Sequence, residues 1–251
     1  MRKVIYKNNN IEIDSGLFFG RGVFETILVK EKAVFLDEHI ERLNKAINAL
    51  SLGKAINKDD VISFINENNI KNKALKIVVT EKNLVYATRD IKYKDEDYIN
   101  GFKVRISEVL RNSTSRVVAF KTLNYLENII EYELCQSSGF NEAIFFNELG
   151  NLCEGCTSNI FIVKNKKIYT PPVKDGLLPG VVRNWVIKNF QVKEARITKE
   201  ELLNSDEVFL TNSLVGVIKV SSIEDKLFDS EVVKEIKKQY DEAINGGEKY
   251  E

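Results

Sequence analysis

Hydrophobic and polar positions follow two different periods in the first hundred residues, which predicts mixed α and β structure. Val23–Val29 (V-F-E-T-I-L-V) is rich in β-branched residues and follows a G-R-G turn, so it predicts a strand. Ala33–Leu36 is expected to form the returning strand of a hairpin. Asp37 is expected to cap a helix that ends at Gly53. The apolar residues at helical spacing in this helix are Ile40, Leu43, Ile47 and Leu50.

A second helix and two more strands follow before the pattern breaks. The helix is expected at about residues 58–68, and the strands at 75–80 and 84–89. Residues 110–116 (L-R-N-S-T-S-R) are polar and turn-like, which is typical of a linker. We therefore expect a small N-terminal α+β domain over residues 1–109, followed by this linker.

The remaining residues, 117–251, predict a larger C-terminal α/β domain. Its helices are expected at about residues 125–136, 181–190, 199–204 and 231–244. Its strands are expected at about residues 117–120, 142–147, 159–163, 167–170, 192–197 and 207–211. The fold class is therefore predicted to be α/β (α+β), with two domains.

Composition removes several classes of function. The 251 residues carry 37 Lys+Arg and 37 Asp+Glu, and this balance argues against a nucleic-acid partner. His39 is the only histidine, so a His-rich or paired-His site is excluded and no metal is expected. Cys153 and Cys156 form a C-x-x-C without a second pair, and we interpret them as ordinary thiols rather than a redox site. No signal-like segment and no run of 18 apolar residues occurs, so we expect a cytoplasmic protein with no membrane partner.

Two polar residues stand out beside predicted strands. Lys121 directly follows an apolar strand in F-K-T-L-N-Y-L, where Asn124 and Tyr125 open a helix. Glu154 lies in the polar turn C-E-G-C-T-S-N, ahead of another strand. A lysine or a turn carboxylate by itself is usually a solvated surface group. Their significance therefore depends on the other segments.

Two further segments supply groups that can hold an anion. In L-L-P-G-V-V-R-N-W, Gly180 precedes a helix, so the backbone N–H groups of Val181 and Val182 point out of the helix N-terminus. The strand in E-V-F-L-T-N-S-L ends in Thr211, Asn212 and Ser213, three hydrogen-bonding side chains in a row.

In this order and spacing, the segments resemble the fold-type IV pyridoxal-phosphate enzymes, the class IV aminotransferase family. The resemblance extends from G-L-F-F-G-R-G-V-F-E-T at Gly16–Thr26 to E-V-F-L-T-N-S-L at Glu207–Leu214. It implies a two-domain enzyme of the D-amino acid aminotransferase-like fold, with the site between the domains. It also implies pyridoxal 5′-phosphate as the cofactor, a small-molecule substrate and a homodimer.

The resemblance assigns roles position by position. Lys121 matches the lysine that holds the cofactor as a Schiff base and acts as the catalytic base. Glu154 matches the carboxylate that keeps the pyridine nitrogen protonated, and Tyr125 matches a tyrosine near the ring oxygen. The expected phosphate ligands are Arg42 in H-I-E-R-L, the backbone N–H groups of Val181 and Val182, and the hydroxyl of Ser213.

Within the family, the motifs favour one group of enzymes. D-amino acid aminotransferases hold the substrate carboxylate with an R-x-H pair, and this chain has no histidine after His39. Branched-chain enzymes usually have a longer, Gly-rich spacer between the lysine and the N-Y pair, whereas here only Thr122 and Leu123 intervene. K-T-L-N-Y-L and T-N-S-L resemble aminodeoxychorismate lyase, which makes 4-aminobenzoate for folate biosynthesis and releases pyruvate.

Two alternatives remain open at this stage. The first is a class IV aminotransferase acting on branched-chain or D-amino acids, and the second is a non-catalytic binding module that retains the fold. The missing proline after Val220 and the E-K-N-L segment after Thr80 depart from the family pattern and bear on the substrate. Candidate cations for the two substrate carboxylates are Arg21, Lys76 and Arg89.

Overall fold

The computed structural model describes residues 2–7 and 10–246, and the chain divides into two compact units. The first unit comprises Met1–Lys92 together with Phe120–Leu126, and the second comprises Tyr93–Ala119 together with Glu127–Glu251. Residues 93–109 thus belong to the second unit, whereas the sequence predicted them in the N-terminal domain. The segment around Lys121 belongs to the first unit, whereas the sequence predicted it in the C-terminal domain. The linker at 110–116 stays a prediction.

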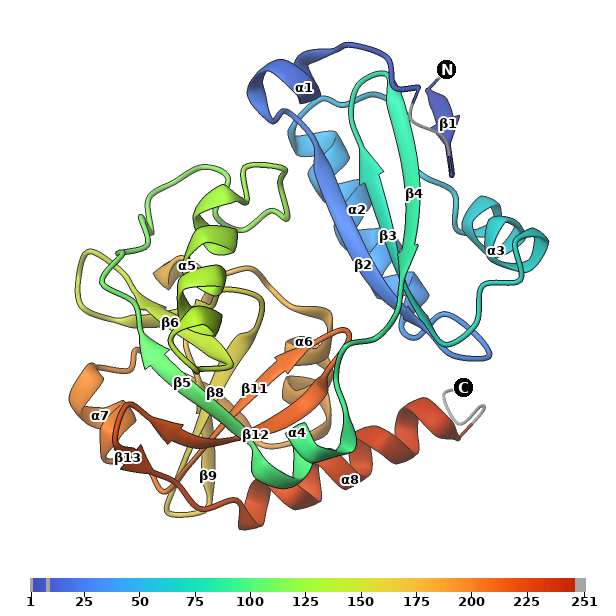
Figure 1. Cartoon of the computed structure of the whole chain (residues 1–251). Coiled ribbons are helices and arrows are strands. Elements are labelled where there is room, and N and C mark those ends of the chain that lie inside the picture. The colour runs from blue at the N-terminus through green and yellow to red at the C-terminus, as the bar shows by residue number, and fades with distance from the viewer. Residues whose placement is uncertain (1, 8–9, 247–251) are drawn as a thin grey trace. The chain divides into compact units, whose positions relative to one another are not determined.

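The first unit is a four-stranded sheet in the order β1-β4-β3-β2 (Figure 1). The strands β2, β3 and β4 pair antiparallel, and β1 pairs parallel with β4. The strands are β1 (Lys3–Ile5), β2 (Val23–Val29), β3 (Lys73–Val79) and β4 (Asn83–Arg89), and the helices are α1 (Ser15–Phe19), α2 (Leu36–Ala49) and α3 (Lys58–Glu67).

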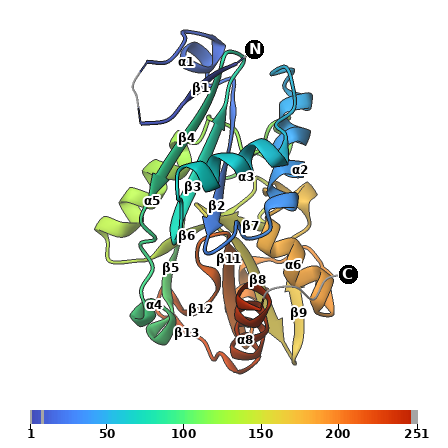
Figure 2. The ribbon, with the colours of Figure 1, turned by 90° about the vertical axis from the view of Figure 1, so that its right-hand side faces the viewer.

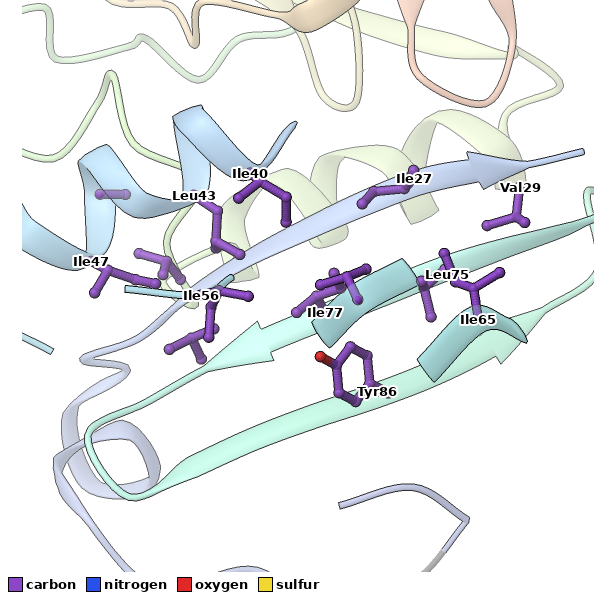
Figure 3. Close-up of a cluster of buried hydrophobic side chains, with 14 of the residues drawn as sticks. Ile27, Val29, Ile40, Leu43, Ile47, Ile56, Ile65, Leu75, Ile77 and Tyr86 are labelled. Carbon is purple, nitrogen blue, oxygen red and sulfur yellow. The ribbon is translucent and has the colours of Figure 1, made fainter. Parts of the chain in front are cut away.

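Helices α2 and α3 cover one face of this sheet, and Figure 3 shows the core between them. Successive strand side chains point to opposite faces, so Val23, Ile27 and Val29 of β2 enter this core, where each is 0–1% exposed. Between Val23 and Ile27 in that alternating series lies Glu25, a carboxylate on the core face of the strand. Its partners are described with the candidate site.

The predicted hairpin strand at Ala33–Leu36 is wrong. Only a single bridge joins Val29 to Ala33, and α2 already begins at Leu36. Phe35 precedes the helix in the left-handed region, with φ 51°, so the chain turns too sharply there to extend a strand. Asp37 therefore lies in the first helical turn, where its charge is favoured by the helix dipole, and it is not the cap.

The second unit contains a ring of six hydrogen-bonded strands, in the circular order β7-β8-β11-β12-β5-β6. The pairing that closes the ring joins β7 to β8 at Glu154 and Asn159. The strands are β5 (Phe102–Ile106), β6 (Glu142–Phe146), β7 (Leu152–Gly155), β8 (Asn159–Lys164), β11 (Glu207–Asn212) and β12 (Gly216–Ile223); β9 (Lys167–Thr170) and β10 (Val192–Glu194) extend the sheet beyond β8, and β13 (Lys226–Leu227) pairs with β12.

Helices pack around this sheet (Figure 2). They are α4 (Asp95–Asn100), α5 (Leu126–Ser137), the short 3-10 helix η1 (Val173–Asp175), α6 (Val181–Asn189), α7 (Lys199–Leu203) and α8 (Glu231–Asn245). Trp185 of α6 meets Tyr240 of α8 edge to face, with ring centroids 5.2 Å apart. Both rings are buried, so this contact packs α6 against α8 beside the sheet.

The predicted strand at Val117–Phe120 is also wrong, because these residues form turns and pair with no strand in the described sheets. The other predicted helices and strands of this part are present, although the strand expected at 192–197 stops at Glu194. None of the helices within the described residues combines the length and apolar character needed to cross a membrane.

Candidate functional site

Lys121 lies in the first unit, on a segment that runs beside β2. The Phe24 N–H donates to the Lys121 carbonyl at 2.8 Å, and the Leu123 N–H donates to the Gly22 carbonyl at 2.9 Å. The Lys121 Nζ lies 4.5 Å from the Phe24 ring centroid and 4.9 Å from that of Tyr125. The amine thus lies over two aromatic rings, at the distances of a cation–π contact.

Close packing of glycines brings this segment against β2. Gly20 adopts φ 64°, and a Cβ there would stand 2.5 Å from Asn124 Oδ1. A Cβ at Gly22 would stand 2.6 Å from a Leu123 methyl group and 2.9 Å from the Val79 carbonyl. The G-R-G turn and the T-L-N segment therefore fit together only because the glycines have no side chain.

Lys76 of β3 approaches the same aromatic ring as Lys121. Its Nζ lies 4.4 Å from the Phe24 centroid, while β3 pairs Lys76 with Thr26 of β2. Desolvation by the surrounding protein, with the positive charge of Arg89, lowers the pKa of the Lys76 ammonium. Of the three candidate cations for the substrate carboxylates, Lys76 is the one whose amine lies over the same aromatic ring as the Lys121 amine. Arg21 donates a hydrogen bond to the Leu50 carbonyl instead.

Arg42 forms a buried cluster with Glu25 and His39. Its Nε donates to Glu25 Oε1 at 2.7 Å, and its Nη2 donates to Glu25 Oε2 at 2.8 Å. His39 Nδ1 lies 2.8 Å from the same Oε2. Burial by itself would raise the pKa of Glu25, but Arg42 and His39 outweigh it and hold that pKa well below its usual range.

Glu154 lies in the second unit, on β7. The Leu178 N–H donates to its Oε2 at 3.0 Å, and Asn159 Nδ2 lies 3.5 Å from the same oxygen. Arg111 Nη2 is 3.9 Å from Oε1. The Glu154 carboxylate thus has one cation and two N–H donors around it.

Asn159 links Glu154 to the N-terminus of α6. Its Nδ2 also donates to the Leu178 carbonyl at 2.8 Å, and a Cβ on Gly180 would collide with its Oδ1. Gly180 is the N-cap of α6 and provides no side-chain acceptor for the first N–H groups of the helix. The N–H groups of Val181 and Val182 therefore remain as donors for an anion, and the packing allows no residue but glycine before them.

Ser213 lies in the turn between β11 and β12. Asn212 Oδ1 accepts the N–H groups of Leu214 at 2.9 Å and Val215 at 2.8 Å, which shapes the turn. The neighbouring Thr211 is 1% exposed, and its Oγ1 has no hydrogen-bond partner among the described residues. An unpaired buried hydroxyl near the end of β11, just before this turn, is a group that a bound ligand can satisfy.

Glu142 supports the turn that carries Glu154 into Asn159. Its carboxylate accepts from the N–H groups of Cys156 at 3.1 Å and Thr157 at 3.2 Å, and from the hydroxyls of Thr157 at 2.8 Å and Ser158 at 3.0 Å. Burial raises the pKa of Glu142, and these neutral donors offset that effect only in part. A buried carboxylate on β6 thus fixes the conformation of the β7–β8 turn through these hydrogen bonds.

The C-x-x-C cysteines are buried, and neither forms a disulfide among the described residues. Burial raises the pKa of the Cys153 thiol to about 12 and also raises that of Cys156. Thiols with raised pKa values are poor nucleophiles, which fits the interpretation of two ordinary thiols.

The structure brings the predicted residues together in two groups. The first unit holds Lys121, Tyr125 and Arg42, and the second holds Glu154, Val181, Val182 and Ser213. Sequence reasoning missed Glu25, Arg111 and Glu142. Glu25 had a signal, since a carboxylate at a core-facing position of an apolar strand needs a buried partner. Arg111 had none, because it stands in a polar, turn-like segment and yet is only 9% exposed.

Comparison with known proteins finds relatives that match most of this chain. The family model described as amino-transferase class IV matches residues 22–223. Three curated relatives are each 30% identical: a putative branched-chain-amino-acid aminotransferase of Methanocaldococcus jannaschii (92% of this chain, 88% of the relative), the aminodeoxychorismate lyase of Bacillus subtilis (87% and 83%) and a D-alanine aminotransferase of Bacillus licheniformis (86% and 84%).

A solved structure supports the same fold. The crystal structure of a putative 4-amino-4-deoxychorismate lyase from Legionella pneumophila is similar with a TM-score of 0.84 and 27% identity, covering 94% of this chain and 98% of that one. The predicted family and the predicted mixed α/β fold of type IV are therefore confirmed. The relatives include both a lyase and aminotransferases at equal identity, so identity does not select the reaction. The chain belongs to the class IV aminotransferase family.

Proposed function

We propose that this protein is a pyridoxal 5′-phosphate-dependent 4-amino-4-deoxychorismate lyase. It would convert 4-amino-4-deoxychorismate into 4-aminobenzoate and pyruvate, a step in folate biosynthesis. The class IV family is pyridoxal-phosphate dependent. We further propose that the protein is a homodimer, as the family resemblance implies, and that it acts in the cytoplasm.

The residues present fit this cofactor. A phosphate dianion calls for a guanidinium, hydroxyls and a helix N-terminus, and these are Arg42, Ser213 and the start of α6 at Val181 and Val182. The orphaned Thr211 hydroxyl beside Ser213 supports a ligand at that turn. Glu154, whose carboxylate lies beside the Leu178 N–H and the Arg111 guanidinium, suits a protonated ring nitrogen.

Each proposed role follows from what the side chain can do. Lys121 provides the primary amine that binds an aldehyde and afterwards holds or moves the proton of the amine-bearing carbon. Tyr125 lies 4.9 Å from that amine by its ring centroid, and its hydroxyl would approach the ring oxygen of the cofactor. When bound, pyridoxal phosphate serves as an electron sink for the carbon that loses this proton. Loss of the enolpyruvyl group then restores an aromatic ring in the product.

One observation favours the lyase over an aminotransferase. Lys76 lies 4.4 Å from the Phe24 ring whose centroid is 4.5 Å from Lys121, so a second cation accompanies the proposed catalytic amine. The lyase substrate has two carboxylates, and a second cation beside the reactive amine suits it. A branched-chain substrate has one carboxylate and an apolar side chain, for which an ammonium at this position is a poor neighbour.

The second candidate is an aminotransferase acting on branched-chain or D-amino acids. It is favoured by the two aminotransferases that match this chain at the same 30% identity as the lyase. Against the D-amino acid branch stands the lack of any histidine after His39, since those enzymes use an R-x-H pair.

A product assay decides between the two. The purified protein is incubated with 4-amino-4-deoxychorismate without any keto acid, and 4-aminobenzoate and pyruvate are measured. We expect equal amounts of both products, and none from the Lys121→Ala variant. Absence of product, combined with turnover of leucine and 2-oxoglutarate, would reverse the assignment. A protein that takes up no pyridoxal phosphate at all would favour the non-catalytic binding module.

A further inference from the structure

We propose that Glu25 is a positioning residue for the cofactor phosphate: it holds the Arg42 guanidinium in one orientation, and His39 in turn holds Glu25. The inference rests on the proposed function, because it takes Arg42 as a ligand of the pyridoxal phosphate. It adds a residue that does not touch the cofactor and acts through the arginine.

Two parallel hydrogen bonds fix the plane of the guanidinium. Arg42 Nε and Nη2 bind the two oxygens of Glu25 at 2.7 and 2.8 Å, the side-on fork that an arginine and a carboxylate prefer. With two of its three nitrogen atoms held by one partner, the side chain can no longer rotate about its last bonds. The direction of Nη1 is therefore set before any ligand arrives, which lowers the entropy lost when an anion binds.

His39 completes the arrangement from the same helix. It precedes Arg42 by three residues on α2, so both side chains lie on one face of the helix. His39 is 1% exposed, and its Nδ1 lies 2.8 Å from Glu25 Oε2. An ionised carboxylate only accepts hydrogen bonds, so Nδ1 must carry the hydrogen. One carboxylate of β2 thus holds two residues of one helical turn.

The buried position of Glu25 indicates that its ion pair with Arg42 has a role besides stabilising the fold. Its side chain emerges on the core face of β2 between Val23 and Ile27, both 0–1% exposed. An apolar residue at such a position commonly stabilises a protein as well as a buried ion pair does, because no charges need to be desolvated. What an apolar residue cannot do is orient the arginine.

Pyridoxal, which lacks the phosphate, separates positioning from folding. The dissociation constants of pyridoxal phosphate and of pyridoxal are measured by absorbance for the apo forms of the wild type, Glu25→Gln and Arg42→Lys. We expect both variants to bind pyridoxal phosphate on the order of tenfold more weakly or worse, with pyridoxal affinity unchanged. We also expect the double variant to be little weaker than either single variant, since the two residues act as one unit.

Glu207→Gln is the matched control. Glu207 is another buried carboxylate, 5% exposed, which accepts the N–H groups of Val232 at 2.9 Å and Val233 at 3.0 Å at the start of α8. It has the same substitution chemistry and a structural role. We expect Glu207→Gln to lower the melting temperature while leaving the ratio of the two affinities as in the wild type.

The single histidine provides a second readout that needs no activity. Its imidazole gives one set of NMR signals, and it is bonded to Glu25. We expect these signals to shift when pyridoxal phosphate or inorganic phosphate is added to the apo wild type, and not when pyridoxal is added. In Glu25→Gln the phosphate-dependent shift should be lost.

The outcomes distinguish the two hypotheses. If Glu25→Gln weakens pyridoxal phosphate and pyridoxal equally, or neither, while Arg42→Lys weakens only the phosphate form, Glu25 is purely structural and the inference is overturned. If the wild type binds pyridoxal phosphate but yields no 4-aminobenzoate, the lyase assignment fails and the inference stands. Should Glu25→Gln not fold, Glu25→Asp keeps the charge with a shorter reach, and the same loss of phosphate preference is expected from it.

Discussion

Glu25 in the first unit and Glu142 in the second are both buried carboxylates, 0% and 1% exposed, yet their pKa values move in opposite directions. Glu25 meets the charges of Arg42 and His39, and its pKa falls well below the usual range. Glu142 meets neutral groups, namely backbone N–H groups, hydroxyls and the Cys156 thiol, and burial raises its pKa. Neutral dipoles satisfy the hydrogen bonds of a buried carboxylate, but a full opposite charge is needed to outweigh its desolvation.

The two carboxylates also suit different tasks. Glu25 orients a cation, the proposed phosphate ligand Arg42. Glu142 shapes the backbone of the β7–β8 turn, next to Glu154. Three measurements can break or sharpen this contrast, and one further measurement tests the charges near Lys121.

The largest effect is expected from removing Glu25. Glu25→Ala leaves Arg42 buried without its carboxylate, and breaking such a pair from one side costs about 3–5 kcal/mol in the free energy of unfolding. Urea unfolding of the apo protein measures it. The double variant Glu25→Leu with Arg42→Met should recover most of this loss, because no charge is left unpaired. Little loss in the single variant would mean that the pair is not desolvated as the structure indicates.

A smaller loss is expected from Glu142→Gln. The amide keeps the shape but offers one acceptor oxygen in place of two, so some of the donors in the β7–β8 turn lose their partner, at about 1–3 kcal/mol. The free energy of unfolding in urea again reports it. A loss as large as that of Glu25→Ala would mean that neutral donors stabilise a buried carboxylate as strongly as a cation does.

Lys76→Met tests whether the charges near Lys121 serve the substrate. The KM for 4-amino-4-deoxychorismate should rise about tenfold, corresponding to roughly 1.4 kcal/mol, while kcat changes less. Lys73→Met, on the same strand and paired with the exposed Asp90, is the control and should leave KM unchanged. An unchanged KM in Lys76→Met would remove the observation that favours the lyase.

The smallest effect is a pH dependence of opposite sign in the two variants. The pKa of Glu25 is lowered in the folded state, so its stabilisation is present above the unfolded value of about 4.5 and is lost as the pH falls below it. The pKa of Glu142 is raised, so its folded form retains a proton above 4.5, and its contribution to stability falls as the pH rises.

Unfolding at several pH values shows the sign directly. Glu25→Gln should destabilise less near pH 3 than near pH 7, and Glu142→Gln should destabilise more near pH 5 than near pH 8, each by on the order of 1 kcal/mol. Slopes of the same sign in both variants would contradict the contrast between the two carboxylates.

The longer helices and several strands could be predicted well from the sequence, whereas most of the shortest elements could not. The strands Val23–Val29 and Lys167–Thr170 have the predicted bounds, and α2 and α8 differ from prediction by a few residues at most at either end. β1, α1, α4, β5, β7, η1 and β13 went unpredicted, since two to six residues contain too few repeats for a period to emerge, and the eight-residue β12 was missed as well. Val117–Phe120 had the composition of a strand and found no partner strand.

By itself the sequence determined the family and the residue types of the proposed chemistry. Lys121, Glu154, Arg42 and Gly180 each lie in a short motif that can be recognised from the neighbouring residues in the sequence. Only the tertiary structure decided which groups surround them. Glu25 reaches Arg42 across 17 residues, and Arg111 reaches Glu154 across 43. The electrostatic environment of a buried group depends on neighbours through space, and these are set by packing of strands and helices that no local pattern encodes.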